Sequence, residues 1–313
     1  MTDYTGPLVS IGIPTYNRAN SYLRCALRSA VSQTYKNIEI IVSDNCSPDN
    51  TESVVREFND PRIRYYKQNE NIGPSKNRDF CLEQARGEYF ALLLDDDLID
   101  DDFISTCMDA VKCHREPGLI LTGARQVDSE GNVLSASHNT VSGYSTGDFI
   151  LGWFDHKVPL YLCSTVFNTK RLKQLGGLRS KTNMYDDVVA YVQLSAKYGR
   201  IDIFDIKASF RRHDSNIGDV VHYSAWCEDS LYLLDVMCNV VPEQAALIRE
   251  RGMSYFSVRN YNRVAAIKSP LKRFSAYLTV YKTFGYGYSP LKFICAKSIS
   301  RVITFLKTKI GNV

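Results

Sequence analysis

Short apolar runs alternate with amphipathic stretches through the first part of the chain. The apolar runs predict buried strands at residues 8–13, 38–42, 63–66, 89–94 and 119–124. Apolar positions spaced three and four apart predict helices at residues 22–31, 51–58, 75–85 and 103–111. Strands and helices that alternate in this way predict a parallel, Rossmann-like sheet, with its loops gathered over one crevice at the carboxyl ends of the strands.

Beyond these elements the pattern is less regular, and we expect the sheet to become mixed. Residues 127–133 predict the tip of a hairpin. Further apolar runs predict strands at residues 160–167, 201–204 and 208–211. From residue 220 the pattern is helical to the end of the sequence. We therefore predict an α/β domain over residues 1–215 and a helical subdomain over residues 216–313.

The apolar run at residues 89–94 ends in three acids, Asp95, Asp96 and Asp97. Open α/β sheets bind their ligands at this end of the strands. Adjacent carboxylates repel one another and persist most readily where a cation is bound. On an extended chain Asp95 and Asp97 would point to the same side, as a D-x-D pair. The alternative is that they are solvated loop acids, which is the interpretation we favour for the next acid run at residues 100–102.

A second pair of acids, Asp186 and Asp187, precedes another predicted helix. A carboxylate at this position can act as a general base, but Asp186 can also simply cap the helix. His213 stands in a polar loop. It is either an ordinary hydrogen-bonding histidine or a ligand of a metal or phosphate.

The formal net charge of +4 hides an asymmetry. From Arg251 onward the chain has twelve Lys or Arg and no Asp or Glu. In the same stretch Leu271, Phe274 and Leu278 recur at helical spacing among basic residues. Such helices can lie on an anionic bilayer, gaining on the order of 1 kcal/mol per basic residue. The alternative is a docked helical subdomain with a solvated basic face.

Other features of the chain limit its location and class. No apolar run reaches the ~18 residues of a membrane span, and residues 1–4 lack the pattern of a signal peptide. Nine cysteines without a C-x-x-C pair are typical of reduced, buried thiols. We expect a cytoplasmic protein, peripheral on the inner face of the cytoplasmic membrane, with no nucleic-acid partner. Because no G-x-G-x-x-G follows the first strand, a dehydrogenase is disfavoured.

Four motifs stand at the ends of the first four predicted strands. They are residues 14–17, residues 42–51, residues 71–73 with Arg78, and residues 87–89 leading to Asp95, Asp96 and Asp97. In this order and spacing they resemble the family 2 nucleotide-sugar glycosyltransferases of the GT-A fold. The resemblance implies a GT-A sheet flanked by helices.

The resemblance also implies roles for single residues. The nucleotide-binding positions of the family fall on Pro14, Thr15, Tyr16, Asp44, Arg78, Asp95 and Asp96. Asp97 would hold a Mg²⁺ or Mn²⁺ ion that bridges the donor diphosphate, and His213 is a further metal candidate. One acid of the later pair would be the catalytic base, and we favour Asp187 over Asp186. Three positions depart from the family pattern: Asp186 replaces the usual glutamate, Asn77 the usual alanine before Arg78, and Asp79 the usual asparagine after it.

The expected reaction follows from this chemistry. Carboxylate oxygens select Mg²⁺ or Mn²⁺, and such a cation neutralises a diphosphate leaving group. We expect metal-dependent, inverting transfer of a sugar from a nucleoside-diphosphate sugar to a hydroxyl of an acceptor, a glycan or lipid-linked glycan of surface polysaccharide synthesis. Two alternatives stay open: a nucleotidyltransferase or other nucleotide-using enzyme, and a catalytically silent protein that binds membranes or polyanions.

Overall fold

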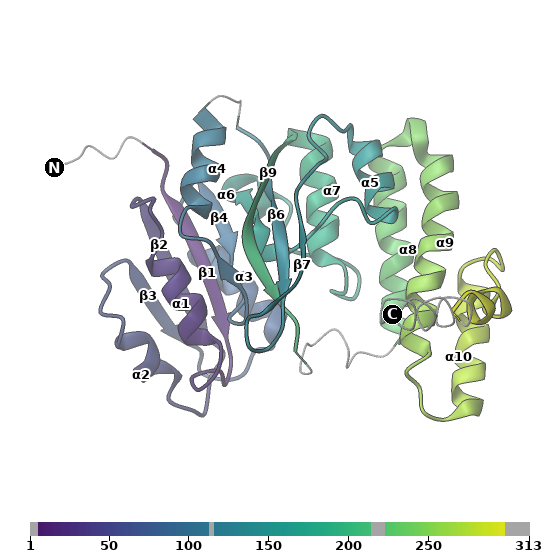
Figure 1. Cartoon of the computed structure of the whole chain (residues 1–313), viewed down its shortest axis with the longest axis horizontal. Helices are drawn as coiled ribbons and strands as arrows, with labels where there is room; N and C mark the ends of the chain where they lie inside the picture. Colours follow the sequence, from purple (N-terminus) through teal and green to yellow (C-terminus); the bar gives the residue numbers. More distant parts are fainter. Residues whose placement is uncertain (1–5, 113–115, 214–222, 298–313) are drawn as a thin grey trace, which may run out of the picture. The chain divides into compact units, whose positions relative to one another are not determined.

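The computed structural model describes residues 6–112, 116–213 and 223–297. The chain divides into two compact units, residues 1–216 and residues 217–313 (Figure 1). The predicted boundary at residue 215 and the last basic helix, from residue 298, lie outside the described residues. Each unit is taken by itself below.

The first unit begins with four parallel strands in the order β3-β2-β1-β4. The strands are β1 (Val9–Thr15), β2 (Ile38–Asp44), β3 (Ile63–Lys67) and β4 (Tyr89–Leu92). The helices between them are α1 (Leu23–Val31), α2 (Thr51–Arg56) and α3 (Pro74–Gln84). All seven residues of β1 and of β2 are buried, including the polar residues Ser10 and Glu39 that stand within the predicted apolar runs.

Side chains on β1 alternate between two helical layers. Ile11 and Ile13 pack in the same core cluster as Leu27 of α1. Gly12 between them faces the other layer, where an added Cβ would come within 2.8 Å of the Cβ of Cys81 in α3. Glycine at this position therefore allows α3 to pack closely on the sheet.

The other half of the sheet is mixed and follows the order β4-β8-β6-β9-β5, with β7 paired to β6. Its strands are β5 (Leu98–Ile99), β6 (Leu119–Val127), β7 (Val133–Ser137), β8 (Thr165–Asn168) and β9 (Arg200–Arg211). Its helices are α4 (Phe103–Lys112), α5 (Thr146–Phe154), η1 (Leu162–Ser164), α6 (Thr169–Gln174) and α7 (Asp186–Tyr198). The α/β class, the mixed sheet and the β6–β7 hairpin are confirmed.

Three expectations about the strands were wrong. The run at residues 160–167 is a strand only from Thr165, in β8, because Leu162–Ser164 form the 3-10 helix η1. The runs at residues 201–204 and 208–211 form one strand, β9, whose register against β6 shifts near Gly123. The strand predicted at residues 89–94, which is β4, does not stay extended through Asp97. It ends at Leu92, and the Asp97 N–H donates to the Leu94 carbonyl at 3.1 Å, closing a turn. The chain turns here because β5, which follows at once, pairs with β9 rather than continuing beside β1.

The second unit is helical. It contains α8 (Tyr223–Val240), η3 (Pro242–Gln244), α9 (Ala245–Val264) and α10 (Pro270–Thr283). Pro242 and Pro270 occupy the first turns of their helices, where a missing N–H costs no hydrogen bond. Within the described residues no single helix is long and apolar enough to cross a bilayer. Only α8 and residues 242–264 taken together, bent by 112°, reach that length and composition.

Candidate active site

The loops after β1 and β2 are tied together at the carboxyl ends of their strands. The Asn45 N–H donates to the Thr15 carbonyl at 2.9 Å, and the Asn17 N–H donates to the Ser47 hydroxyl at 2.9 Å. Asn17 and Cys46 both adopt left-handed backbone angles, with φ of 56° and 63°, as tight loops require. The predicted nucleotide-binding segment, residues 14–16, therefore has a fixed course, with Thr15 buried and the Tyr16 side chain 45% exposed.

Asp44 is fully buried at the end of β2. One carboxylate oxygen accepts the Ser47 N–H at 2.8 Å, and the other accepts the Tyr65 hydroxyl at 2.6 Å. Burial, together with this carboxylate, raises the pKa of the Tyr65 phenol above its usual range. Asp44 thus shapes the turn after β2 and is also held in one orientation from β3. Tyr65 was not among the residues predicted from the sequence.

Asn77, which replaces the usual alanine of the family pattern, joins α3 to β2. Its side-chain amide donates to the Ser43 carbonyl at 2.8 Å, and its oxygen accepts the Ser43 hydroxyl at 2.6 Å. These bonds fix the first turns of α3, and with them the position of Arg78. The substitution therefore has a structural explanation.

The turn after β4 contains Asp95, Asp96 and Asp97 and is called the acid turn below. The carboxylates of Asp95 and Asp97 are poorly solvated there. Burial raises the pKa of Asp95 to about 6; the nearby Thr15 side chain opposes this rise, and the charge of Asp96 adds to it. Asp97 is buried, and burial followed by the charge of Asp96 raises its pKa well above the ordinary value. Both groups would be stabilised as carboxylates by a nearby cation.

The end of β9 closes this turn from the other side. The Arg211 N–H donates to Asp97 Oδ1 at 2.9 Å, and Arg211 Nε donates to the Asp96 carbonyl at 2.9 Å. His213 Nε2 lies 2.7 Å from Asp96 Oδ2. The ring of Tyr22 stacks on His213 at 5.2 Å and lies 4.7 Å from the Arg211 guanidinium. His213 therefore belongs to the acid turn but contacts Asp96, not Asp97.

Cys163, in η1, lies beneath the same turn. Its buried thiol lies close to Asp97, and burial followed by the charge of Asp97 raises its pKa. The cysteine pattern predicted only a small buried side chain, so this contact was missed. Tyr191 of α7 is also buried and lies close to Cys163 and to Asp187, both of which raise its pKa further. Asp97 of the acid turn is thus close to Cys163, and Asp187 of the second acid pair is close to Tyr191, which itself lies close to Cys163.

The second acid pair begins α7. Asp186 is buried and forms an ion pair with Arg78 at 2.5 Å. Its other oxygen accepts the Asp187 N–H at 2.9 Å. Burial and the charge of Asp186 raise the pKa of Asp187 to about 7, while the charge of Arg78 lowers it. Asp186 is therefore held in an ion pair with Arg78, whereas Asp187, with a pKa of about 7, can exchange a proton near neutral pH.

The donor set suits Mg²⁺ or Mn²⁺ held jointly with a substrate. Among the described residues no group of three or more His, Cys, Asp or Glu is placed to hold a metal ion. Mg²⁺ in nucleotide enzymes usually keeps several waters and takes only one or two carboxylates, with phosphate oxygens as the other ligands. Asp95 and Asp97 can supply those carboxylates, and the raised pKa of each is the observation that favours a cation there.

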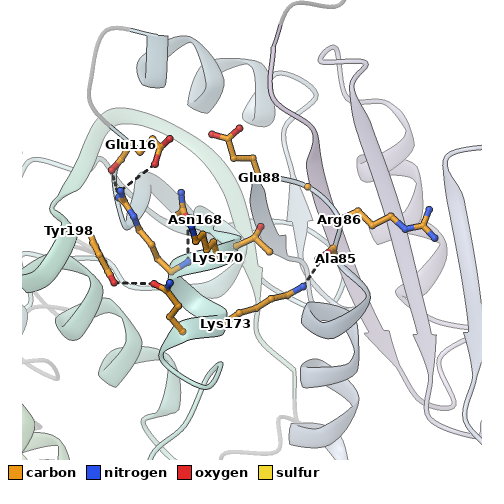
Figure 2. A pocket seen from close by; sticks show the side chains of 12 residues that line it. Ala85, Arg86, Glu88, Glu116, Asn168, Lys170, Lys173 and Tyr198 are labelled. Atoms are coloured by element: carbon orange, nitrogen blue, oxygen red, sulfur yellow. Dashed lines mark hydrogen bonds and ion pairs between the residues drawn. The ribbon is translucent and has the colours of Figure 1, made fainter.

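A hollow of about 790 Å³ lies at the opposite, amino end of β4 (Figure 2). It contains none of the predicted site residues. Its lining is Ala85, Arg86, Gly87, Glu88, Glu116, Asn168, Thr169, Lys170, Arg171, Lys173, Gln174 and Tyr198. Lys173 donates to the Ala85 carbonyl at 2.9 Å, and Arg171 forms an ion pair with Glu116 at 3.4 Å. Two of its cations are therefore used to hold the walls together, and size alone does not make this hollow the reaction site.

Part of the chain is similar in sequence to known glycosyltransferases. Residues 10–156 match the family model described as glycosyl transferase family 2. The chain is 35% identical to chondroitin synthase of Escherichia coli over 136 residues, which is 42% of this chain and 19% of that protein. It is 38% identical over 130 residues to the GalNAc(5)-diNAcBac-PP-undecaprenol beta-1,3-glucosyltransferase of Campylobacter jejuni, covering 41% of each. The chain thus spans less than half the length of these relatives.

Solved structures share the fold. TarS 1–349 of S. aureus in complex with UDP-GlcNAc superposes with a TM-score of 0.59 at 14% identity, over 88% of this chain and 89% of that one. The mannosyltransferase PcManGT of Pyrobaculum calidifontis, in complex with GDP-Man and Mn²⁺, gives a TM-score of 0.54 at 16% identity, over 96% and 82%. At these identities the likeness concerns the fold, and it confirms the predicted GT-A architecture.

Proposed function

Because residues 10–156 match the family model of glycosyl transferase family 2, we propose that the chain transfers a sugar from a nucleoside-diphosphate sugar to a hydroxyl of a glycan acceptor, with inversion and with the help of Mg²⁺ or Mn²⁺. The observation that carries the proposal is that the acid turn holds carboxylates with raised pKa values. Asp95 and Asp97 have raised pKa values at the carboxyl end of the central strand. Buried carboxylates of this kind fit a site completed by a cation and a diphosphate.

The donor would lie over the loops after β1, β2 and β4. Thr15 and Tyr16 would contact the nucleotide, and Asp44, oriented by Tyr65, would accept hydrogen bonds from the base. Asp95, with Asp96 beside it, would face the ribose. A bound Mg²⁺ or Mn²⁺ held by Asp97 would neutralise charge that develops on the leaving diphosphate. His213 contacts Asp96 through Nε2, so binding of this nitrogen to the same ion would break that hydrogen bond.

Asp187 is the better candidate for the general base. A base works best when its pKa lies near the operating pH, and the pKa of Asp187 is about 7. Its carboxylate would take the proton from the acceptor hydroxyl as the new bond forms on the face opposite the leaving group. Asp186 and Arg78 would orient this residue through the start of α7. The guanidinium of Arg78 has five N–H donors, so pairing with Asp186 leaves capacity for the ribose or base.

A lipid-linked glycan is the acceptor that we favour. The Campylobacter jejuni relative is named for an acceptor carried on PP-undecaprenol, and its matched region covers 41% of this chain. Such an acceptor would bring the protein to the inner face of the cytoplasmic membrane, which is the location predicted from the sequence.

Thermal shift measurements with UDP, dTDP, GDP and CDP, each with and without Mn²⁺, test the proposal. A ligand at 100 times its dissociation constant stabilises by ~2.7 kcal/mol, which is easily detected. We expect a shift with one nucleoside diphosphate that depends on Mn²⁺, is lost in Asp97→Asn and is kept in the matched control Asp101→Asn, whose acid is exposed. A Mn²⁺-dependent shift that survives in Asp97→Asn would contradict the metal role. Release of pyrophosphate instead of nucleoside diphosphate would favour nucleotidyl transfer.

A further inference from the structure

Helix α10 has two apolar faces, and among the described residues of its unit only one of them is buried. Ala276, Tyr277 and Val280 are buried, and α10 packs against α9 (Figure 1). Three large apolar side chains project from the other face: Leu271 is 83% exposed, Phe274 63% and Leu278 48%. Their spacing of three and four residues puts them in one row along the helix. A helix with an unused apolar row of this size exposes a binding surface.

The row continues in charge and in sequence. Lys282 follows Leu278 by one helical turn and is exposed, so it stands at the end of the same row. Residues 290–297 are again helical, with Leu291 74% exposed and Ile294 44% exposed. Lys292 is exposed beside them. Apolar and cationic side chains therefore alternate over both stretches.

No acid interrupts this region. From Arg251 to the end of the sequence there is no Asp or Glu. The basic residues of its described part are Arg251, Arg259, Arg263, Lys268, Lys272, Arg273, Lys282, Lys292 and Lys297. Apolar rows flanked only by cations match the headgroup region of an anionic bilayer, which offers hydrocarbon and negative charge together.

We propose that α10 and residues 290–297 dock on an anionic lipid bilayer, with Leu271, Phe274, Leu278 and Leu291 entering the headgroup region and the lysines contacting phosphate groups. A second copy of this chain fits less well, because two faces of this kind would bring cation against cation. A nucleic acid would use the cations but leave the row of leucines and phenylalanine without a partner. The inference rests on the proposed function, because a lipid-linked acceptor in the bilayer is the reason for the protein to bind there. Its test measures bilayer binding and does not need sugar transfer.

Vesicle flotation of the full chain provides the test, with phosphatidylcholine vesicles that contain or lack phosphatidylglycerol. We expect binding only to the anionic vesicles and a decrease with added NaCl. The triple variant Leu271→Ser, Phe274→Ser, Leu278→Ser should lose binding. Lys272→Gln with Lys282→Gln should weaken it by roughly 30-fold, which is about fivefold for each charge. Leu134→Ser, on the 57% exposed leucine of β7, and Lys170→Gln serve as matched controls that should bind like the parent chain.

Several outcomes would overturn the inference. They are absence of flotation with anionic vesicles, unchanged flotation of the triple variant, or a dimer in light scattering that the triple variant abolishes while vesicle binding persists. The metal-dependent nucleotide shift separates this failure from failure of the transferase proposal. The triple variant should keep that shift, and Asp97→Asn should keep vesicle binding.

Discussion

The two ends of β4 differ in how their charged side chains are paired. At the amino end, Lys173 and Arg171 are matched by carbonyls and by Glu116 around a hollow of about 790 Å³. At the carboxyl end, Asp97 is fully buried and Asp95 is partly buried, and the pKa of each is raised. The cations at the amino end are thus held by hydrogen bonds and an ion pair, whereas the carboxylates at the carboxyl end have perturbed pKa values. Perturbed carboxylates, rather than the volume of a hollow, are the reason for placing the proposed reaction site at the carboxyl end.

The largest effect is expected from Asp187→Asn. Loss of a general base costs about 10²–10⁴-fold in rate, while donor binding should be retained. In the parent chain kcat/KM should rise with pH through about 7, because the base must be deprotonated and the pKa of Asp187 is about 7. Steady-state kinetics over pH checks both points. A pH profile that is flat between 6 and 8, or full activity in Asp187→Asn, would remove this residue from the mechanism.

Next comes Arg78→Met, which leaves Asp186 buried without its cation. Removing one partner of a buried ion pair destabilises by about 3 kcal/mol, to be measured by urea unfolding. The pKa of Asp187 should also rise, because Arg78 lowers it, so the rising limb of the pH profile should move to higher pH. Arg56→Met, in the exposed pair with Glu52, is the matched control, with an expected change of about 0.5 kcal/mol. Equal effects of the two variants would contradict a special role for the Arg78 pair.

Tyr65→Phe should have an intermediate effect. It deprives the fully buried Asp44 carboxylate of a donor at 2.6 Å, which costs about 1–3 kcal/mol of stability and should weaken nucleotide binding. Tyr198→Phe removes a hydroxyl at the amino end, where it donates to Gln174 at 3.2 Å near the surface. Denaturation and thermal shift on both variants compare the two ends directly. A greater loss of nucleotide binding in Tyr198→Phe would reverse the assignment of the site.

The smallest effect is expected from Lys173→Ala. Its hydrogen bonds to the Ala85 and Glu83 carbonyls are part of the wall at the amino end, so stability should fall by about 1 kcal/mol. The donor KM and kcat should not change. A clear change in either constant would show that the hollow takes part in the reaction, and the contrast between the two ends would then fail.

The fold class was predictable because local patterns determine it. β1 and β2 are mainly apolar and are buried on both faces, and the loop acids follow at strand ends, where sheet topology gathers them. The bend after Leu92 was not predictable from the same pattern, since β5 pairs with β9, a strand far along the chain. Residues 201–204 and 208–211 looked like two strands because polar residues separate them, yet pairing with β6 carries one strand through.

The partners of the site residues were largely beyond the sequence. Arg78 meets Asp186 across 108 positions, and His213 meets Asp96 across 117. Tyr22 was assigned to the helical stripe, but it is the residue before α1 and it stacks on His213. No local signal marks these contacts. The predicted roles of the individual site residues, and the predicted location of the protein, stay predictions.

The contact between Arg211 and Asp97 also bears on the order in which the protein assembles. These residues are 114 positions apart, and contacts that close such long loops form late in folding. During synthesis the parallel strands β1 to β4 can pair before β9 has been made, and the acid turn then lacks its closing contacts with Arg211 and His213. A nascent chain would thus present four paired strands with an unfinished turn, and the acid turn would be complete only once the last strand of the sheet is added.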